Sequence, residues 1–72
     1  MSELVSRLRE ARAGRGWTQA ELAERVGVTR KTINTVENGV FTPSTTLALK
    51  LARALETSVE ALFQLAEDGR SG

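Results

Sequence analysis

Apolar residues recur every three or four positions along most of this chain, which is the spacing of an amphipathic helix. No segment alternates between apolar and polar residues in the manner of a half-buried strand. The first helix is predicted from about Ser2, a suitable N-cap, to about Ala13, with Leu4, Leu8 and Ala11 on its buried side. The glycine-containing segment that follows is expected to end it.

Two short helices come next, separated by Gly27. Thr18 is expected to cap a helix over residues 19–26, and the glutamate three positions later completes a capping box. Thr29 is expected to cap the following helix, which begins at Arg30 and ends at about Asn38. Two short helices joined by a turn with a small residue are the arrangement that presents the second helix to the major groove of DNA.

A fourth helix is predicted to begin at Ser44 or Thr45 and to end at Leu55, and Ser58 is expected to cap a fifth. The side chains expected to face the core from the last four helices are all apolar, and they are Leu22, Ala23, Val26, Ile33, Val36, Leu47, Ala48, Leu51, Ala52, Leu55, Val59, Leu62 and Phe63. We therefore expect an all-α domain of five helices.

The length of 72 residues permits one domain, which we place at residues 1–66, with a polar, frayed tail at residues 67–72. Cysteine and histidine are both absent, so the usual catalytic bases, thiolates and zinc ligands are missing. We expect no enzyme activity, no metal and no cofactor. No apolar run approaches the roughly 18 residues of a membrane span, and no signal peptide is recognisable, so we expect a cytoplasmic protein with no membrane partner.

Charge is distributed unevenly, although the net charge is only +1. Residues 1–38 carry seven cations and five acids, whereas residues 39–72 carry three cations and four acids. This mild asymmetry places the side that faces an anionic partner in the first half.

The exposed side of the third helix carries hydrogen-bonding residues. With Ile33 at the centre of the buried side, a rotation of about 100° per residue turns a polar set toward solvent. Arginine and lysine can donate to guanine, and asparagine can pair with adenine through two hydrogen bonds. The outward residues are Arg30, Lys31, Asn34, Thr35 and Asn38.

The run TQAELAERVGVTRKTINTVENG (Thr18–Gly39) resembles the Cro/repressor class of helix-turn-helix proteins, also called the xenobiotic-response-element (XRE) class. The stretch TPSTTLALKLARALETSVEALF (Thr42–Phe63) is similar to the fourth and fifth helices of the same class. The resemblance covers about Leu4 to Phe63 and implies a lambda-repressor-like DNA-binding domain.

By this resemblance, the base-reading positions are Thr29, Arg30, Lys31, Asn34 and Thr35. The positions implied to contact the DNA backbone are Thr18, Gln19, Asn38, Phe41 and Thr42, with Gln19 also bracing the recognition helix. The resemblance further implies a buried structural ion pair between Arg12 and Glu37. Many relatives have glutamine or serine where this chain has Arg30 and Lys31, so these cations could read guanine or hold phosphates.

Several residues have other interpretations. Trp17 fits the edge of the core, stapled against Leu22, better than a platform for base stacking. Phe41 could pack under its loop, meet a phosphate or contact a partner. Three apolar residues lie outside the predicted buried sides of the helices, and they could form a subunit contact or be incidentally exposed: Val5, Leu49 and Leu65.

The function indicated is a transcriptional regulator, expected to be a repressor that binds double-stranded palindromic DNA as a homodimer. One alternative is an antitoxin, which would bind a toxin protein and also repress its own operon; the short segment after Phe63 argues against it. Another alternative is a protein-interaction module that no longer contacts DNA.

Overall fold

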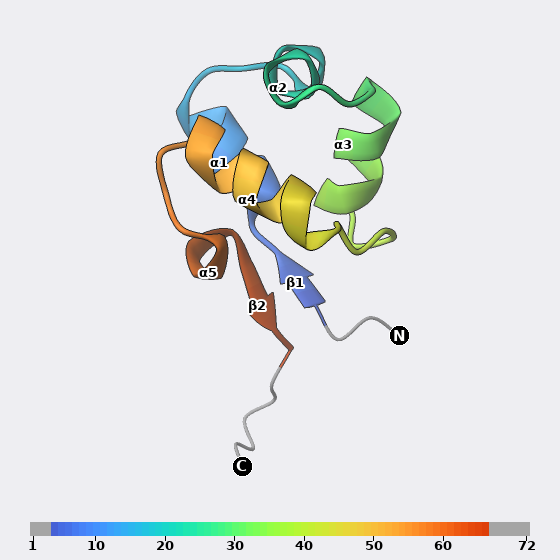
Figure 1. The fold of residues 1–72 in the computed structure, drawn as a ribbon, viewed down its shortest axis with the longest axis vertical. Coiled ribbons are helices and arrows are strands. Elements are labelled where there is room, and N and C mark those ends of the chain that lie inside the picture. Colours follow the sequence, from blue (N-terminus) through green and yellow to red (C-terminus); the bar gives the residue numbers. More distant parts are fainter. Residues whose placement is uncertain (1–3, 67–72) are drawn as a thin grey trace.

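The computed structural model describes residues 4–66. The predicted Ser2 cap and the predicted frayed tail at residues 67–72 lie outside the described residues. In chain order the elements are β1 (Leu4–Ser6), α1 (Leu8–Gly14), α2 (Gln19–Val26), α3 (Arg30–Glu37), α4 (Thr45–Ala54), α5 (Val59–Leu62) and β2 (Phe63–Leu65) (Figure 1). Within this range no helix is long and apolar enough to cross a membrane.

Helix boundaries in the middle of the chain follow the predicted caps. The Thr18 hydroxyl accepts a hydrogen bond from the backbone N–H of Glu21 at 3.0 Å, and the Glu21 carboxylate accepts one from the Thr18 N–H at 2.7 Å. Gly27 ends α2 with a φ of 78°, a left-handed conformation that glycine adopts without steric cost. The hydroxyls of Thr29, Ser44 and Ser58 cap the three later helices, each by accepting a hydrogen bond from the backbone N–H three residues further along.

The core is apolar and is formed by all five helices together with β2. Leu8, Leu22, Ile33 and Leu51 are completely buried, and Trp17 and Val59 pack partly buried against the same cluster. The buried side chains predicted for the second to fifth helices are confirmed, with Val59 only partly buried. Helices α2, α3 and α4 pack together, which leaves α3 at one side of the body (Figure 1).

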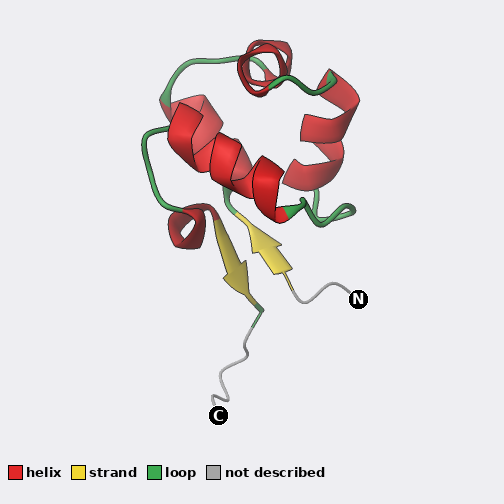
Figure 2. Ribbon diagram, in the orientation of Figure 1, coloured by secondary structure: helices red, strands yellow, loops and turns green. Residues whose placement is uncertain are grey.

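The all-α prediction is wrong at both ends of the described chain, where a two-stranded antiparallel sheet is present (Figure 2). Leu4 lies opposite Leu65, and Ser6 lies opposite Phe63. The first helix therefore begins at Leu8 rather than near Ser2. Leu4 packs against the core from a strand instead of a helix. An apolar residue at this position is compatible with either conformation.

The fifth helix is also shorter than the sequence suggested. It is a single turn, and the chain becomes extended at Phe63, which remains buried as predicted. The N–H of Arg7 donates to the carbonyl of Leu62 at 2.7 Å, which continues the pairing toward α1. Backbone groups of residues 4–7 and 62–65 thus satisfy one another, as buried or partly buried backbone groups require.

Candidate nucleic-acid interface

Helix α3 has one buried side and one polar side, as predicted. Ile33 and Val36 are buried in the core, whereas Arg30, Lys31 and Asn34 are exposed. Thr29, just before the helix, and Asn38, at its end, are exposed as well, and Thr35 is half-buried. The side chains predicted to face a groove therefore lie on one accessible surface, which we call the α3 surface: Thr29, Arg30, Lys31, Asn34, Thr35 and Asn38.

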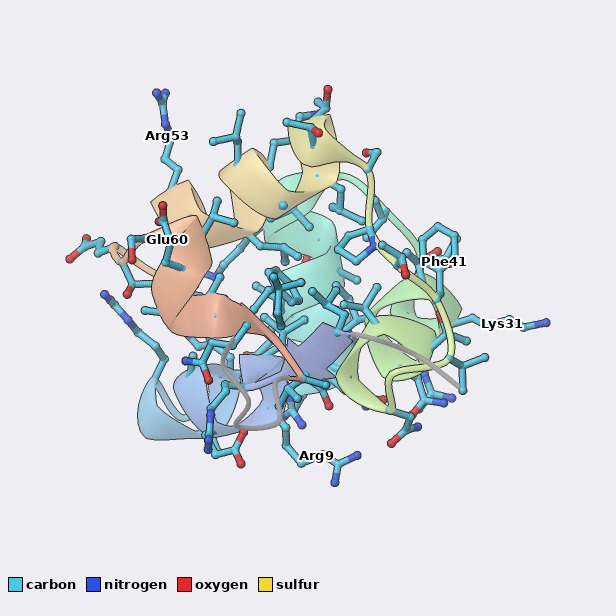
Figure 3. All side chains as sticks on the ribbon, turned by 90° about the horizontal axis from the view of Figure 1, so that it is seen from below. Arg9, Lys31, Phe41, Arg53 and Glu60 are labelled. Atoms are coloured by element: carbon cyan, nitrogen blue, oxygen red, sulfur yellow. The ribbon has the colours of Figure 1, made fainter. Side chains whose placement is uncertain are left out.

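Two cations on this surface are free to meet an anion. Within residues 4–66, the ion pairs involve Arg9 and Arg12 with Glu37, and Arg15 with Glu56. Arg30 and Lys31 are not among them. In Figure 3 Lys31 extends away from the body, and Phe41 lies on the same side of the molecule. Both cations can therefore reach phosphates or guanine acceptors without first breaking an internal ion pair.

Behind the α3 surface lies the ion pair that the resemblance implied. The Arg12 Nε donates to Glu37 Oε2 at 2.6 Å, and its Nη2 donates to Oε1 at 3.1 Å. The Glu37 side chain is fully buried, and that of Arg12 is 16% exposed. Arg12 also donates to the Trp17 carbonyl at 2.8 Å, so one guanidinium joins α3, α1 and the loop before α2. Such a two-point contact fixes both position and orientation.

The carboxylate of Glu37 remains ionised because its partners outweigh the effect of burial. Burial raises the pKa of Glu37. Hydrogen bonds from Arg12 and Gln19, together with the charge of Arg12, lower the pKa by more than burial raises it, so the pKa lies below the ordinary value. The hydrogen bond to Glu37 raises the pKa of Arg12, against the opposing effect of burial. The pair is therefore charged throughout the physiological range.

A chain of polar contacts leads from this ion pair to the α3 surface. The Gln19 Nε2 donates to Glu37 Oε1 at 3.0 Å and to Asn34 Oδ1 at 3.2 Å. Asn38 also donates to Asn34 Oδ1, at 3.2 Å, and accepts from Arg9 Nη2 at 2.6 Å. Gln19 therefore braces the recognition helix as the sequence analysis expected; its predicted contact with a phosphate remains a prediction.

Asn34 has less freedom for base contact than the sequence suggested. Its amide oxygen already accepts two hydrogen bonds, whereas no other described residue accepts from its amide NH₂ group. A bidentate contact with adenine needs both the oxygen and the NH₂ group. In this arrangement Asn34 can offer the donor alone, which suits the acceptor atoms of guanine, adenine or thymine.

Three of the threonines predicted to contact DNA also make hydrogen bonds within the protein. Thr18 and Thr29 are helix caps, and the Thr29 hydroxyl additionally lies 3.0 Å from that of Thr32. The Thr35 hydroxyl donates to the carbonyl of Thr32 at 2.9 Å, so its oxygen is left as an acceptor. These bonds hold the hydroxyls at defined positions on or beside α3.

The loop after α3 folds back onto the helix. Backbone N–H groups of Val40 and Phe41 donate to the Thr35 carbonyl at 3.0 and 3.2 Å. Phe41 borders a hollow of about 300 Å³ whose lining also includes Val28 and Leu47, but the residue is still 47% exposed. Phe41 therefore packs under its loop in part, which is the first of its three interpretations. The rest of the residue is exposed beside the α3 surface. Thr42 is exposed and next to it.

Trp17 lies at the edge of the core, in agreement with the first of its two interpretations. The Arg25 guanidinium carbon lies 4.0 Å from the centre of its ring, and that of Arg15 lies 5.6 Å away. Both distances allow cation–π attraction. The indole is therefore already engaged with side chains of its own chain.

Sequence reasoning missed Arg9, which contacts both Glu37, at 3.5 Å, and Asn38. A signal existed, because Arg9 precedes Arg12 by three residues and side chains at that spacing share one side of a helix. Among residues 4–66, no group of three or more His, Cys, Asp or Glu side chains is arranged to hold a metal ion.

Comparison with known proteins identifies relatives across the same part of the chain. A helix-turn-helix family model matches residues 8–62. An uncharacterized HTH-type transcriptional regulator of Methanothermobacter thermautotrophicus is 54% identical over 63 residues, which cover 86% of this chain and 91% of the relative. The antitoxin HipB of Escherichia coli K12 is 33% identical over 58 residues, covering 81% of this chain and 66% of HipB.

Solved structures agree with this relationship. The restriction-modification controller protein C.AhdI of Aeromonas hydrophila has a TM-score of 0.71 and 39% identity, over 75% of this chain and 82% of C.AhdI. SinR, a master regulator for biofilm formation whose structure was solved in complex with DNA, has a TM-score of 0.70 and 29% identity, over 75% of this chain and 87% of the SinR chain. The fold that contains α2 and α3 is thus shared with known regulators, and the chain belongs to the Cro/repressor-type (XRE) family of helix-turn-helix transcriptional regulators.

Proposed function

We propose that this protein is a cytoplasmic repressor that binds a palindromic operator as a homodimer, with α3 of each subunit in the major groove. The observation that carries the proposal is the α3 surface itself, where Arg30 and Lys31 form no ion pair with any residue between 4 and 66 and stand beside exposed amide and hydroxyl groups. SinR, a relative of similar fold, was solved with DNA, which supports the same mode of binding here.

Base reading belongs to the residues near the start and middle of α3. Arg30 and Lys31 would donate to guanine or to flanking phosphates, and the free NH₂ group of Asn34 would donate to a base acceptor. Thr35 would accept through its hydroxyl oxygen or contact a thymine methyl. Thr29, exposed at the cap, would meet the adjacent base or its phosphate. Each good bidentate base contact contributes about 1–3 kcal/mol of discrimination.

Backbone contacts would come from residues around the two ends of the motif. Thr18 and Gln19 stand at the start of α2, where the positive end of the helix dipole favours a phosphate. Asn38, Phe41 and Thr42 stand beyond the end of α3, on the exposed loop. These contacts would position the protein on DNA and make its affinity depend steeply on salt.

Selection of bound duplexes from a random pool tests the proposal, and the selected sequence should contain two inverted half-sites. Replacing Arg30 and Lys31 with alanine should then weaken binding to that duplex at least tenfold while the far-ultraviolet circular dichroism spectrum stays unchanged. A matched control is Arg7→Ala, which removes an exposed cation outside the α3 surface. If the double variant binds as tightly as the control, the interaction-module alternative is favoured and the DNA-binding proposal fails.

A second candidate function is that of an antitoxin, which the relationship to HipB favours. In that case the protein would bind a toxin protein and also repress its own operon. Purification of the tagged protein from its native host distinguishes the two candidates: a stoichiometric second protein would favour the antitoxin, and purification as a homo-oligomer alone would favour the repressor.

A further inference from the structure

Three amide side chains beside α3 are joined in one row of hydrogen bonds. Gln19 Nε2 and Asn38 Nδ2 each donate to Asn34 Oδ1, both at 3.2 Å. Gln19 Nε2 also donates to Glu37 Oε1 at 3.0 Å, and Asn38 Oδ1 accepts from Arg9 Nη2 at 2.6 Å. We call Gln19, Asn34 and Asn38 the amide row; a carboxylate stands at one end of it and a guanidinium group at the other.

The charged groups at the two ends determine how the outer amides are turned. A side-chain amide offers an oxygen acceptor on one side and an NH₂ donor on the other, so a half turn exchanges the two. The ionised carboxylate of Glu37 only accepts, so Gln19 must turn its NH₂ group toward it. The guanidinium group of Arg9 only donates, so Asn38 must turn its oxygen toward Arg9 and its NH₂ group toward Asn34.

Asn34 has a single orientation that suits both neighbours. Gln19 and Asn38 each present an NH₂ group to it, so its oxygen faces them and its own NH₂ group is left for an outside partner. A half turn of Asn34 would bring three NH₂ groups together and break both bonds. The Glu37 end is also held in place, because its side chain is fully buried and accepts two hydrogen bonds from Arg12.

We propose that Arg9 and Glu37 are positioning residues, which act through the amide row to make Asn34 a hydrogen-bond donor toward DNA and thereby set its base specificity. This inference rests on the proposed function, because it places α3 in the major groove. In that groove guanine offers two acceptors, thymine and adenine offer one each, and cytosine offers none. Asn34 should therefore favour guanine or thymine and disfavour cytosine, whose N4 group is itself a donor. Adenine, whose acceptor lies beside a donor, should rank between them.

The row strengthens this discrimination because cytosine can be accepted only if Asn34 turns its oxygen toward the base. That half turn breaks both of its bonds within the row, since neither neighbour can turn with it while a charged group holds it. One hydrogen bond corresponds to about a twofold to tenfold change in an equilibrium constant. The penalty against cytosine therefore includes the bonds of the row as well as the missing contact to the base.

Asn34→Asp distinguishes the two orientations, because aspartate has the same shape as asparagine but two acceptor oxygens. In the orientation described, one oxygen still accepts from the row, and only the atom that faces DNA changes from donor to acceptor. Preference at the contacted base pair should then move toward cytosine, whose N4 group can donate to a carboxylate. In the opposite orientation the outward atom would be an oxygen before and after the change, so the preferred base would stay the same.

The measurement uses four duplexes that differ at one base pair, the pair at which Asn34→Ala loses its preference in a random-pool selection. Fluorescence anisotropy gives the affinity of each protein for each duplex. A charge added or removed near the phosphates changes all four affinities together. The quantity compared is therefore the ratio of the affinity for the favoured base to the affinity for cytosine.

Arg9→Met removes the donor at one end of the row, so Asn38 becomes free to turn. Asn34 can then meet cytosine with the loss of one bond instead of two, and the ratio should fall by about threefold or more. Arg9→Lys keeps a group that only donates and should restore most of the ratio. Arg7→Met, which removes another exposed cation from the same part of the chain, is the matched control and should leave the ratio unchanged.

Spectra of the free protein test the row without DNA. In ¹⁵N-labelled protein, Arg9→Met should shift the side-chain NH₂ signals of Asn34 and Asn38, and Arg9→Lys should shift them less. The inference is overturned if Arg9→Met leaves these signals unchanged or discriminates as strongly as Arg7→Met. It is also overturned if the unchanged protein favours cytosine or if Asn34→Asp keeps the original ranking of bases. Failure of the unchanged protein to bind any duplex would instead contradict the proposed function, and the spectra would still test the row.

Discussion

Glu37→Ala is expected to be one of the most destabilising single substitutions in this domain. The change removes a fully buried carboxylate that accepts hydrogen bonds from Arg12, Gln19 and Arg9. Arg12 would then keep its charge in a position where only 16% of its side chain is exposed. The substitution therefore strands a cation, in addition to removing favourable contacts.

The expected loss is about 3–5 kcal/mol of unfolding free energy, the usual range for removing one partner of a buried ion pair. A domain of this length has a total stability of roughly 4–11 kcal/mol. The variant should therefore melt about 12 °C or more below the unchanged protein, or be unfolded at room temperature. Urea denaturation monitored by circular dichroism, with thermal melting beside it, measures both quantities.

Most of the expected loss comes from the stranded guanidinium, and a second variant tests this origin. Replacing Arg12 and Glu37 together with leucine removes both charges at once, so that neither is left buried without its partner. The double variant should be more stable than Glu37→Ala. A loss below about 1 kcal/mol for Glu37→Ala, or a double variant no more stable than the single one, would refute the reasoning.

Three further predictions concern single residues. The pKa of Glu37 is lower in the folded than in the unfolded state, so the stability that Glu37 contributes is full above about pH 5 and declines as the pH falls below the unfolded pKa of about 4.3. Glu37→Gln should therefore show a weaker loss of stability in acid when urea denaturation is measured at several pH values. An unchanged loss would contradict the assignment. Gly27→Ala should cost about 1–2 kcal/mol, because a Cβ there meets no atom within 4 Å but the φ of 78° is unfavourable for alanine; equal stability in denaturation would be inconsistent with that conformation. Asn34→Ala should broaden base preference in a random-pool selection with little change in melting temperature, since the side chain is exposed; a large thermal destabilisation would instead assign it a structural role.

Local patterns in the sequence were sufficient for the middle of the fold. Caps at Thr18, Thr29 and Ser44 and the break at Gly27 are each determined by side chains within a few residues, so the boundaries of α2, α3 and α4 were predicted to within one residue. The buried and exposed sides of α3 followed from helical periodicity alone.

The sheet could not be predicted in the same way. Residues 4–6 pair with residues 63–65, almost the full length of the domain away, and a three-residue strand is too short to show an alternating pattern. Strand formation depends on the partner more than on the segment itself. Leu4 and Leu8 have a helical spacing, so the local signal favoured the wrong conformation for the first of them.

At the candidate site, sequence reasoning identified the residues of the α3 surface but not the contacts among them. The Arg12–Glu37 ion pair could be predicted from the family resemblance, but its two-point geometry is known only from the structure. Arg9 joins the same carboxylate through a rotamer that no local pattern specifies. The occupied oxygen of Asn34 likewise depends on Gln19 and Asn38, which reach it from two different positions in the sequence.

The most direct test of the central claim is a titration of the ¹⁵N-labelled protein with its selected duplex, followed by amide NMR spectra. If α3 enters the major groove, the largest shifts should fall on residues 29–35, on the side-chain NH₂ signals of Asn34 and on the start of α2. The signals of β1 and β2 should change little. Shifts concentrated on the sheet or on α5, with α3 unaffected, would contradict the account.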